Sequence, residues 1–369
     1  MTIRLAIPSI EEDDLAAVRE VLASGFLVQG ARVVAFERAV AEHVGSAHAV
    51  AVSNCTAALY LSLVALGVQA GDKVAVASYS WPATANVIAL VGAEPVFVDI
   101  ERETFNIDPN LLADVLRRER VKAVLPVHTF GGMANMPAIM ELAARHGAAV
   151  VEDAACALSA DLGGRRAGTW GAMGCFSFHP RKAITTGEGG IVATDDAALA
   201  RRLRILRNHG QDPDATTPDF VEPGHNMRLT EFQAALGLTQ MGKLERIVAS
   251  RRQQAGRYDA LLEGSGIRAP RAVAGSHHVY QSYVVLVPPE AAARRNEVIA
   301  ALRADGIETT IGTYHIPLTR YFRERWQYAA GRFPCTDDVA ERAISLPLFE
   351  RLTEGEQALI VSRLTSLVG

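Results

Sequence analysis

The chain has 369 residues, of which 49% are hydrophobic and 21% charged, so it can bury a sizeable core in one large domain and a smaller one. Its net charge of −4 gives no basic signal for nucleic acid or a membrane surface. The acidic N-terminus is unlike a signal peptide and no apolar run approaches about 18 residues, so we expect a cytoplasmic protein without a membrane span. The four cysteines form no CxxC pair, and we expect neither a metal site nor a disulfide framework.

In chain order, the first 30 residues predict a helix over 11–24 and an extended arm over 25–30. Short β-branched runs then alternate with Ala- and Leu-rich stretches of helical pattern. The predicted strands lie at 48–53, 73–78, 94–100, 123–128, 148–153, 174–178 and 190–194, and the predicted helices at 56–66, 83–91, 110–120 and 136–146. Apolar runs without strict alternation fit strands buried on both faces. The pattern therefore predicts an α/β fold with a mostly parallel mixed sheet covered by helices.

After residue 195 the pattern becomes mainly helical. Helices are predicted at 197–207 and, as one long arginine-rich helix, at 230–258. The remainder predicts a strand (279–287), a helix (292–305), an extended stretch (309–314) and a terminal helix (353–367). We therefore divide the chain into an N-terminal arm and helix (1–30), a large α/β domain (31–250) and a small C-terminal α+β domain (251–369).

Lysine is rare in this chain, since only four of its 37 basic residues are lysines. Arginine stays charged in proteins, whereas lysine can lose its proton and act as a nucleophile. Lys182 follows a hydrophobic strand and precedes a glycine-rich turn, and Arg181 is its neighbour, so we expect its pKa to be lowered. The other three, Lys73, Lys122 and Lys243, fit solvent-exposed positions.

Two further stretches lie at predicted strand ends. The small polar residues 53–58 join a strand to a helix, which suits either a phosphate cradle or an ordinary helix cap. Glu152 and Asp153 end another strand, where they could serve acid–base chemistry, a metal, a cationic ring nitrogen or only solvation.

A phosphate cradle, a carboxylate and an amine at the strand ends of one sheet form the set that pyridoxal 5'-phosphate (PLP) requires. In that set Lys182 would form the Schiff base, and Asp153 would keep the ring nitrogen protonated. Trp81 could lie flat on the ring or could instead be a core residue.

With these motifs the sequence resembles the sugar-nucleotide aminotransferases of the DegT group, which are fold type I PLP-dependent enzymes. The resemblance covers nearly the whole chain. Its motifs, in order, are Gly25–Gly30 followed by Phe36-Glu37, Ser53–Leu59, Gly92–Asp99, His128–Gly131, Glu152–Ala155, Phe176–Gly190, Arg207–Gly210, Asn226–Leu229 and Ser345–Phe349.

The resemblance implies a role for each matching site residue. Lys182 is the Schiff-base lysine and Asp153 the partner of the ring nitrogen. The other implied cofactor contacts are Thr56, Ser177 and the backbone of Cys55 and Ala57 at the phosphate, Trp81 on the ring, and Asn226 reaching the cofactor of the partner subunit in a homodimer. His179 and Arg228 are implied to line the substrate site.

Three positions depart from the family's usual residues. Cys55 and Ser159 stand where glycine is common. Cys156 stands where Gln or His often contacts the phenolic oxygen of the cofactor, so that contact is lost or made by water. Some family members carry His in place of the lysine and dehydrate sugars, and Lys182 argues against that activity here.

The resemblance implies amino transfer from an amino acid, expected to be L-glutamate, to a keto sugar, with pyridoxamine phosphate as the intermediate cofactor form. A nucleotide-linked keto-deoxysugar is the leading acceptor, and a keto-cyclitol of aminoglycoside-type biosynthesis is the alternative. A non-catalytic regulator that binds PLP or a sugar is a third possibility. The intact pair of Lys182 and Asp153 weighs against it, because a sensor needs no transferable amine.

Overall fold

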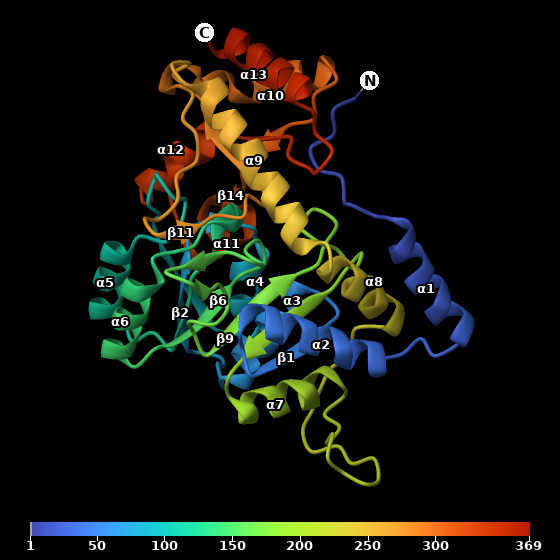
Figure 1. The fold of residues 1–369 in the computed structure, drawn as a ribbon. Coiled ribbons are helices and arrows are strands. Elements are labelled where there is room, and N and C mark those ends of the chain that lie inside the picture. Colours follow the sequence, from blue (N-terminus) through green and yellow to red (C-terminus); the bar gives the residue numbers. More distant parts are fainter. Residues whose placement is uncertain (1) are drawn as a thin grey trace.

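A computed structural model describes residues 2–369, and its centre is a seven-stranded sheet in the order β1-β10-β9-β6-β5-β2-β4 (Figure 1). β10 runs antiparallel to both of its neighbours, and the other adjacent pairs are parallel. The predicted mostly parallel mixed sheet is therefore confirmed. The strands are β1 (His48–Val52), β2 (Lys73–Ala77), β4 (Glu94–Val98), β5 (Ala123–Leu125), β6 (Ala149–Asp153), β9 (Met173–Ser177) and β10 (Gly190–Thr194).

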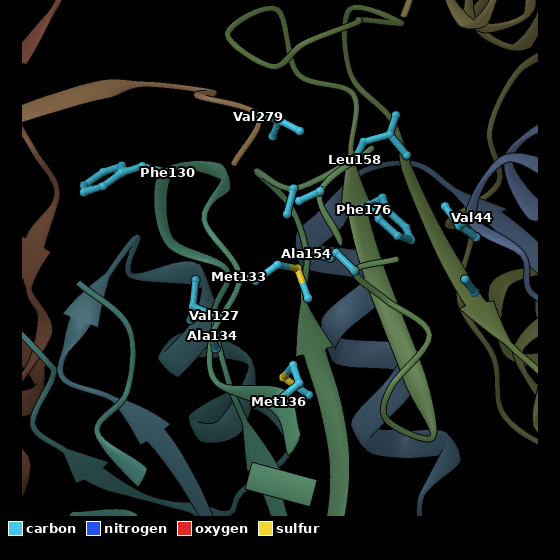
Figure 2. Packing of buried hydrophobic residues seen from close by; sticks show 14 of the residues in the cluster. Val44, Val127, Phe130, Met133, Ala134, Met136, Ala154, Leu158, Phe176 and Val279 are labelled. Atoms are coloured by element: carbon cyan, nitrogen blue, oxygen red, sulfur yellow. The ribbon is translucent and has the colours of Figure 1, made fainter. Parts of the chain in front are cut away.

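Helices cover both faces of this sheet, and each face has its own core. Ala49 and Ala51 of β1 pack on the side of α2 (Ala31–Val44), α5 (Pro109–Arg118) and α6 (Met136–His146). Figure 2 shows Phe176 of β9 and Ala154, which follows β6, in this core. Val50 and Val52 point the other way, as successive strand residues must. The second face is covered by α3 (Cys55–Ala65), α4 (Ala83–Leu90) and α7 (Ala197–Arg207).

The helix predicted over 230–258 is two helices, α8 (Glu231–Met241) and α9 (Leu244–Leu262), so that prediction was wrong. Glycine in a helix interior costs about 1 kcal/mol relative to alanine, and Gly242 lies at the break. The expected exposure of Lys243 was also wrong, because it is only 8% exposed. Its Nζ donates to Asp13 and Asp14 of α1 (Glu12–Ser24), at 2.6 Å from each carboxylate. These ion pairs hold α1 against the start of α9.

The C-terminal part has a separate core around a three-stranded sheet, in the order β12-β15-β13. α9 runs from the central sheet to this part, and both chain ends lie near it (Figure 1). The proposed division at residue 250 remains a prediction. The elements here are β12 (Tyr283–Leu286), η2 (Pro289–Arg294), α10 (Arg295–Ala304), β13 (Thr310–Ile311), η3 (Ile316–Leu318), α11 (Arg320–Trp326), α12 (Pro334–Arg342), β15 (Ala343–Leu346) and α13 (Glu354–Val368).

Short elements connect the two parts. β14 pairs with β3, which follows β2 directly, and β11 pairs with β7. Across residues 2–369, no helix combines the length and apolar character needed to cross a membrane. The short elements are β3 (Tyr79–Ser80), η1 (Thr129–Gly131), β7 (Asp161–Leu162), β8 (Arg165–Arg166), β11 (Ser276–His277) and β14 (Tyr314–His315).

Candidate active site

Asp153 is the last residue of β6, and its side chain lies on the face of the sheet that α3 and α4 cover. It is buried, and its Oδ2 accepts a hydrogen bond from the hydroxyl of Thr84 in α4 at 2.7 Å. Its Oδ1 accepts from the backbone N–H of Ala155 at 3.2 Å. Two donors therefore orient this carboxylate at the carboxyl edge of the sheet, where α/β folds place their ligands. Thr84 is a site residue that the sequence analysis missed.

Glu152, one residue earlier, points to the opposite face and has a different role. Its carboxylate accepts hydrogen bonds from the backbone N–H groups of Gly168, Trp170 and Gly171 at 2.6–2.8 Å. It also accepts from His128 Nε2 at 2.9 Å. The other ring nitrogen of His128 accepts from a backbone N–H, which fixes the proton on Nε2. Glu152 is therefore a buried structural anchor, and the interpretation of the two acids as one catalytic or metal-binding pair does not hold.

Lys182 lies just after β9 and reaches toward the same edge as Asp153. Its Nζ donates to the sulfur of Cys156 at 3.0 Å, and its backbone N–H donates to the carbonyl of His179 at 2.8 Å. The carbonyl of Lys182 accepts from Nη2 of Arg251, a buried residue of α9, at 3.3 Å. Burial lowers the pKa of Arg251 to about 10. Arg251 was not predicted from the sequence. It binds backbone carbonyls, which every residue has, so no side-chain motif indicates its partners.

The pKa of Lys182 is raised above its ordinary value, contrary to the prediction. Burial acts to lower this pKa, but the neighbouring Cys156, which accepts a hydrogen bond from the amine, and Asp153 favour the ammonium and outweigh it. The side chain of Arg181, which was expected to lower it, is exposed to solvent. Free Lys182 is therefore an ammonium at neutral pH and must lose a proton before it can act as a nucleophile.

The start of α3 lies against β10, next to the end of β9. Gly190 pairs with Val52 on one side and Ser177 on the other. A Cβ on Gly190 would lie 2.4 Å from the carbonyl carbon of Asn54, so only glycine permits this approach. The sheet therefore brings the hydroxyl-bearing Ser177 to the edge where α3 begins.

The N-terminus of α3 has backbone donors available for an anion. The side chain of Asn54 caps the helix by accepting from the N–H of Ala57 at 2.9 Å. Within residues 2–369, the N–H groups of Cys55 and Thr56 have no backbone or side-chain acceptor. Two free donors at the positive end of a helix suit a phosphate group. The structure thus offers the N–H groups of Cys55 and Thr56 for this role, while that of Ala57 already serves the cap.

The remaining predicted residues lie around this edge. Trp81 is 61% exposed and packs edge to face on Tyr314, with ring centroids 5.4 Å apart. His179 is half-buried, and burial lowers its pKa, with further lowering from Lys182 and Arg181.

The segment containing Asn226 and Arg228 runs beside the start of α3. Asn226 is exposed, and the carbonyl of the following residue, Met227, accepts from the N–H of Ser53 at 2.8 Å. Arg228 donates to the side chain of Asn208 at 2.6 Å. The proposed roles of these two residues therefore remain predictions.

Two of the departures from the family pattern have a structural account. Cys55 is buried in the core beneath α3, and burial raises the pKa of its thiol well above the ordinary value, so the thiol stays neutral. Ser159 has φ +74°, a conformation that favours glycine. Its hydroxyl lies 2.7 Å from Nε2 of His43, a hydrogen bond that offsets part of this strain.

A lysine amine, an oriented carboxylate and a helix N-terminus with free donors meet at one edge of an α/β sheet, and these are the groups that PLP requires. The fold and this site define the class of PLP-dependent aminotransferases. The model of the DegT/DnrJ/EryC1/StrS aminotransferase family matches residues 8–365. The chain belongs to this family, and PLP is its cofactor.

Solved structures agree with this assignment. The chain is 27% identical to PseC of Helicobacter pylori, an aminotransferase involved in the biosynthesis of pseudoaminic acid, with a TM-score of 0.94 over 100% of this chain and 99% of PseC. It is 34% identical to the aminotransferase TlmJ of Streptoalloteichus hindustanus, with a TM-score of 0.91 over 99% and 98% of the two chains. A Streptococcus pneumoniae protein solved in its PLP form is 26% identical, with a TM-score of 0.94 over 100% and 99%.

Proposed function

We propose that this protein transfers an amino group from L-glutamate to a keto sugar, and that the acceptor is a nucleotide-linked keto-deoxysugar. The observation that carries the proposal is the convergence of Lys182, Asp153 and the N-terminus of α3 at one edge of the sheet. The Streptococcus pneumoniae protein, which is described as a sugar aminotransferase, supports a sugar as the acceptor. The proposal includes a cytoplasmic location.

In this proposal the bound cofactor supplies an electron sink, and the protein supplies position and proton transfer. Asp153, held by Thr84, keeps a proton on the ring nitrogen. Lys182 moves the proton of the substrate as general acid and base. Thr56, Ser177 and the N–H groups at the start of α3 hold the phosphate, Trp81 covers the ring, and His179 and Arg228 line the substrate side.

We propose in addition a homodimer in which Asn226 of each subunit reaches the phosphate of the partner's cofactor. Large apolar side chains in and beside the N-terminal arm are exposed, with Phe26 at 80% and Val28 and Val34 both at 63%. Exposed apolar side chains this large suit burial against a second copy.

Mixing two inactive variants tests the shared site. Lys182→Ala and Asn226→Asp, allowed to exchange subunits, should regain up to about half the activity per mixed dimer, because one of the two sites then carries neither change. If heterodimers form without any recovery of activity, Asn226 acts within its own chain.

The amino transfer itself is tested in two half-reactions. Adding L-glutamate to the PLP-loaded protein should remove the visible band of the bound cofactor and release 2-oxoglutarate. A panel of nucleotide-linked keto sugars and keto-cyclitols should then restore that band with one class of acceptor. A protein that binds the cofactor but shows no change with any amino acid would be a regulator, and the proposed function would be wrong.

A further inference from the structure

A second hydroxyl group lies behind the one that holds Asp153. Thr84 of α4 is buried, and its Oγ1 lies 2.7 Å from Oδ2 of the Asp153 carboxylate. The hydroxyl of Ser80, which is also buried, lies 3.1 Å from the same Thr84 oxygen. The three side chains therefore form one buried series of hydrogen bonds. The functions proposed so far use only the last of these bonds.

The available acceptors determine the direction of the bonds. The Thr84 hydroxyl has one proton and two acceptors within reach, Oδ2 of Asp153 at 2.7 Å and the carbonyl of Trp81 at 3.2 Å. The carboxylate takes the proton, because hydrogen bonds to charged acceptors are shorter and stronger. Ser80 must then donate to Thr84, since the Thr84 proton is already used. A hydroxyl that accepts a hydrogen bond is a better donor, so Ser80 strengthens the bond from Thr84 to Asp153.

The backbone holds both hydroxyl groups in place. Ser80 is the last residue of β3 and pairs with Tyr314 of β14, in the C-terminal part of the chain. Thr84 lies in the first turn of α4. Within residues 2–369, the Asp153 carboxylate has one other donor, the backbone N–H of Ala155 at 3.2 Å. Thr84 therefore makes the shorter of the two contacts that oppose rotation of the carboxylate.

We propose that Ser80 and Thr84 are positioning residues whose hydroxyl groups, bonded in series, hold the Asp153 carboxylate in one orientation for the ring nitrogen of the cofactor. The inference rests on the proposed function, in which Asp153 pairs with that nitrogen. A carboxylate that is already oriented loses less rotational freedom when it accepts a charge-assisted hydrogen bond. The two hydroxyl groups should therefore favour binding of a ring that carries a protonated nitrogen, and should not affect binding of a ring without one.

Two cofactors that differ at this one atom test the proposal. They are PLP and 1-deaza-PLP, in which a C–H group replaces the ring nitrogen, and each is titrated into full-length protein stripped of cofactor. Thr84→Val keeps the shape of the side chain without its hydroxyl, and it should raise the Kd of PLP about fivefold and leave that of 1-deaza-PLP unchanged. Ser80→Ala should raise the Kd of PLP about twofold. Thr84→Ser, which keeps the hydroxyl, should restore the wild-type values.

Thr336 provides a matched control elsewhere in the fold. It is buried, its hydroxyl donates to the buried carboxylate of Asp99 at 2.7 Å, and the hydroxyl of Ser78 lies 2.6 Å from it. Thr336→Val and Thr84→Val should both lower the urea midpoint of unfolding, because each removes a donor from a buried carboxylate. Thr336→Val should leave the Kd of both cofactors at the wild-type value.

The paired Kd values separate positioning from a general loss of packing. An equal rise for both cofactors in Thr84→Val would overturn the proposal, and so would no change in either. A wild-type Kd of PLP in Ser80→Ala would show that the series does not extend beyond Thr84, and would overturn the proposal as stated.

The proposed function is judged separately, by the half-reaction of the wild-type protein with amino acids. If that protein binds PLP but reacts with no amino acid, the proposed function fails. The paired Kd values would still decide whether the two hydroxyl groups orient Asp153.

Discussion

On one face of β6, the carboxylate of Glu152 accepts hydrogen bonds from three backbone N–H groups and from His128. These bonds hold the 168–171 loop against the sheet. On the other face, Asp153 is held by a single side chain, Thr84, and one backbone N–H. Both carboxylates are buried, and they are neighbours in sequence. Because successive strand residues point to opposite faces, Glu152 enters a structural network and Asp153 lies at the edge where we propose that the cofactor binds.

Burial of a charged side chain does not by itself indicate a catalytic or binding role. Glu152 has more hydrogen-bond donors than Asp153, which is typical of a buried charge that stabilises a fold. Asp153 has fewer partners, and it lies near Lys182, whose pKa is raised above its ordinary value.

Lys182→Arg should abolish amino transfer and cofactor attachment while leaving the fold intact. Arginine keeps the charge and a long stem, but its guanidinium does not provide a free amine. The glutamate half-reaction and the visible spectrum measure the loss, and a urea unfolding curve close to that of the wild type is the control. Residual transfer above the level of free PLP in solution would contradict the assignment of this lysine.

Asp153→Asn should retain PLP but lower turnover at least about a hundredfold, because the ring nitrogen need no longer stay protonated. The fold should change little, since asparagine keeps an oxygen that can accept from Thr84. Turnover measured at saturating glutamate checks the prediction. Near-normal turnover would show that another group holds the ring nitrogen.

Glu152→Gln is the matched change on the opposite face, and it should lower the free energy of unfolding by about 3 kcal/mol. The amide replaces one acceptor oxygen by an NH2 group that would face the N–H groups of the 168–171 loop. Urea unfolding measures the loss. The variant should still bond PLP through Lys182, and a loss of attachment in fully folded protein would show that Glu152 acts at the site.

Acid should weaken the fold through His278, which is buried beside Gly132. Burial lowers the pKa of His278 to about 3, whereas in the unfolded chain it is near 6.5. The unfolded state therefore binds the extra proton between these values, so the stabilising contribution is complete above pH 6.5 and is lost as the pH falls toward 3.

The expected loss from this residue is about 1.4 kcal/mol per pH unit below 6.5. Unfolding free energies of the wild type and His278→Gln at pH 7, 6 and 5 measure it by difference, which removes the contribution of the other histidines. Parallel pH profiles for the two proteins would contradict the assignment.

Many strands and helices could be predicted from the sequence, because each has a characteristic spacing of apolar residues. The seven strands of the central sheet lie where apolar runs predicted them. Helix α2 was not predicted, although Val33, Phe36, Val40 and Val44 are spaced as one buried helix face, so the signal was present.

What sequence could not show depends on contacts between distant segments. Lys243 lies 229 residues from Asp14, and no local pattern indicates that these two side chains form an ion pair. The same holds for Arg251, which supports the carbonyl of Lys182 from α9. Cys156 was noted as a departure from the family pattern, but its contact with Lys182 required the folded chain.

The central claim is that Lys182 bonds the cofactor, and the most direct test is to trap that bond in the wild-type protein. PLP-loaded protein is reduced with borohydride, digested and analysed by mass spectrometry. The account predicts a pyridoxyl group on the peptide that contains Lys182, in about one copy per chain. A label on Lys73, Lys122 or Lys243 in place of Lys182 would contradict it.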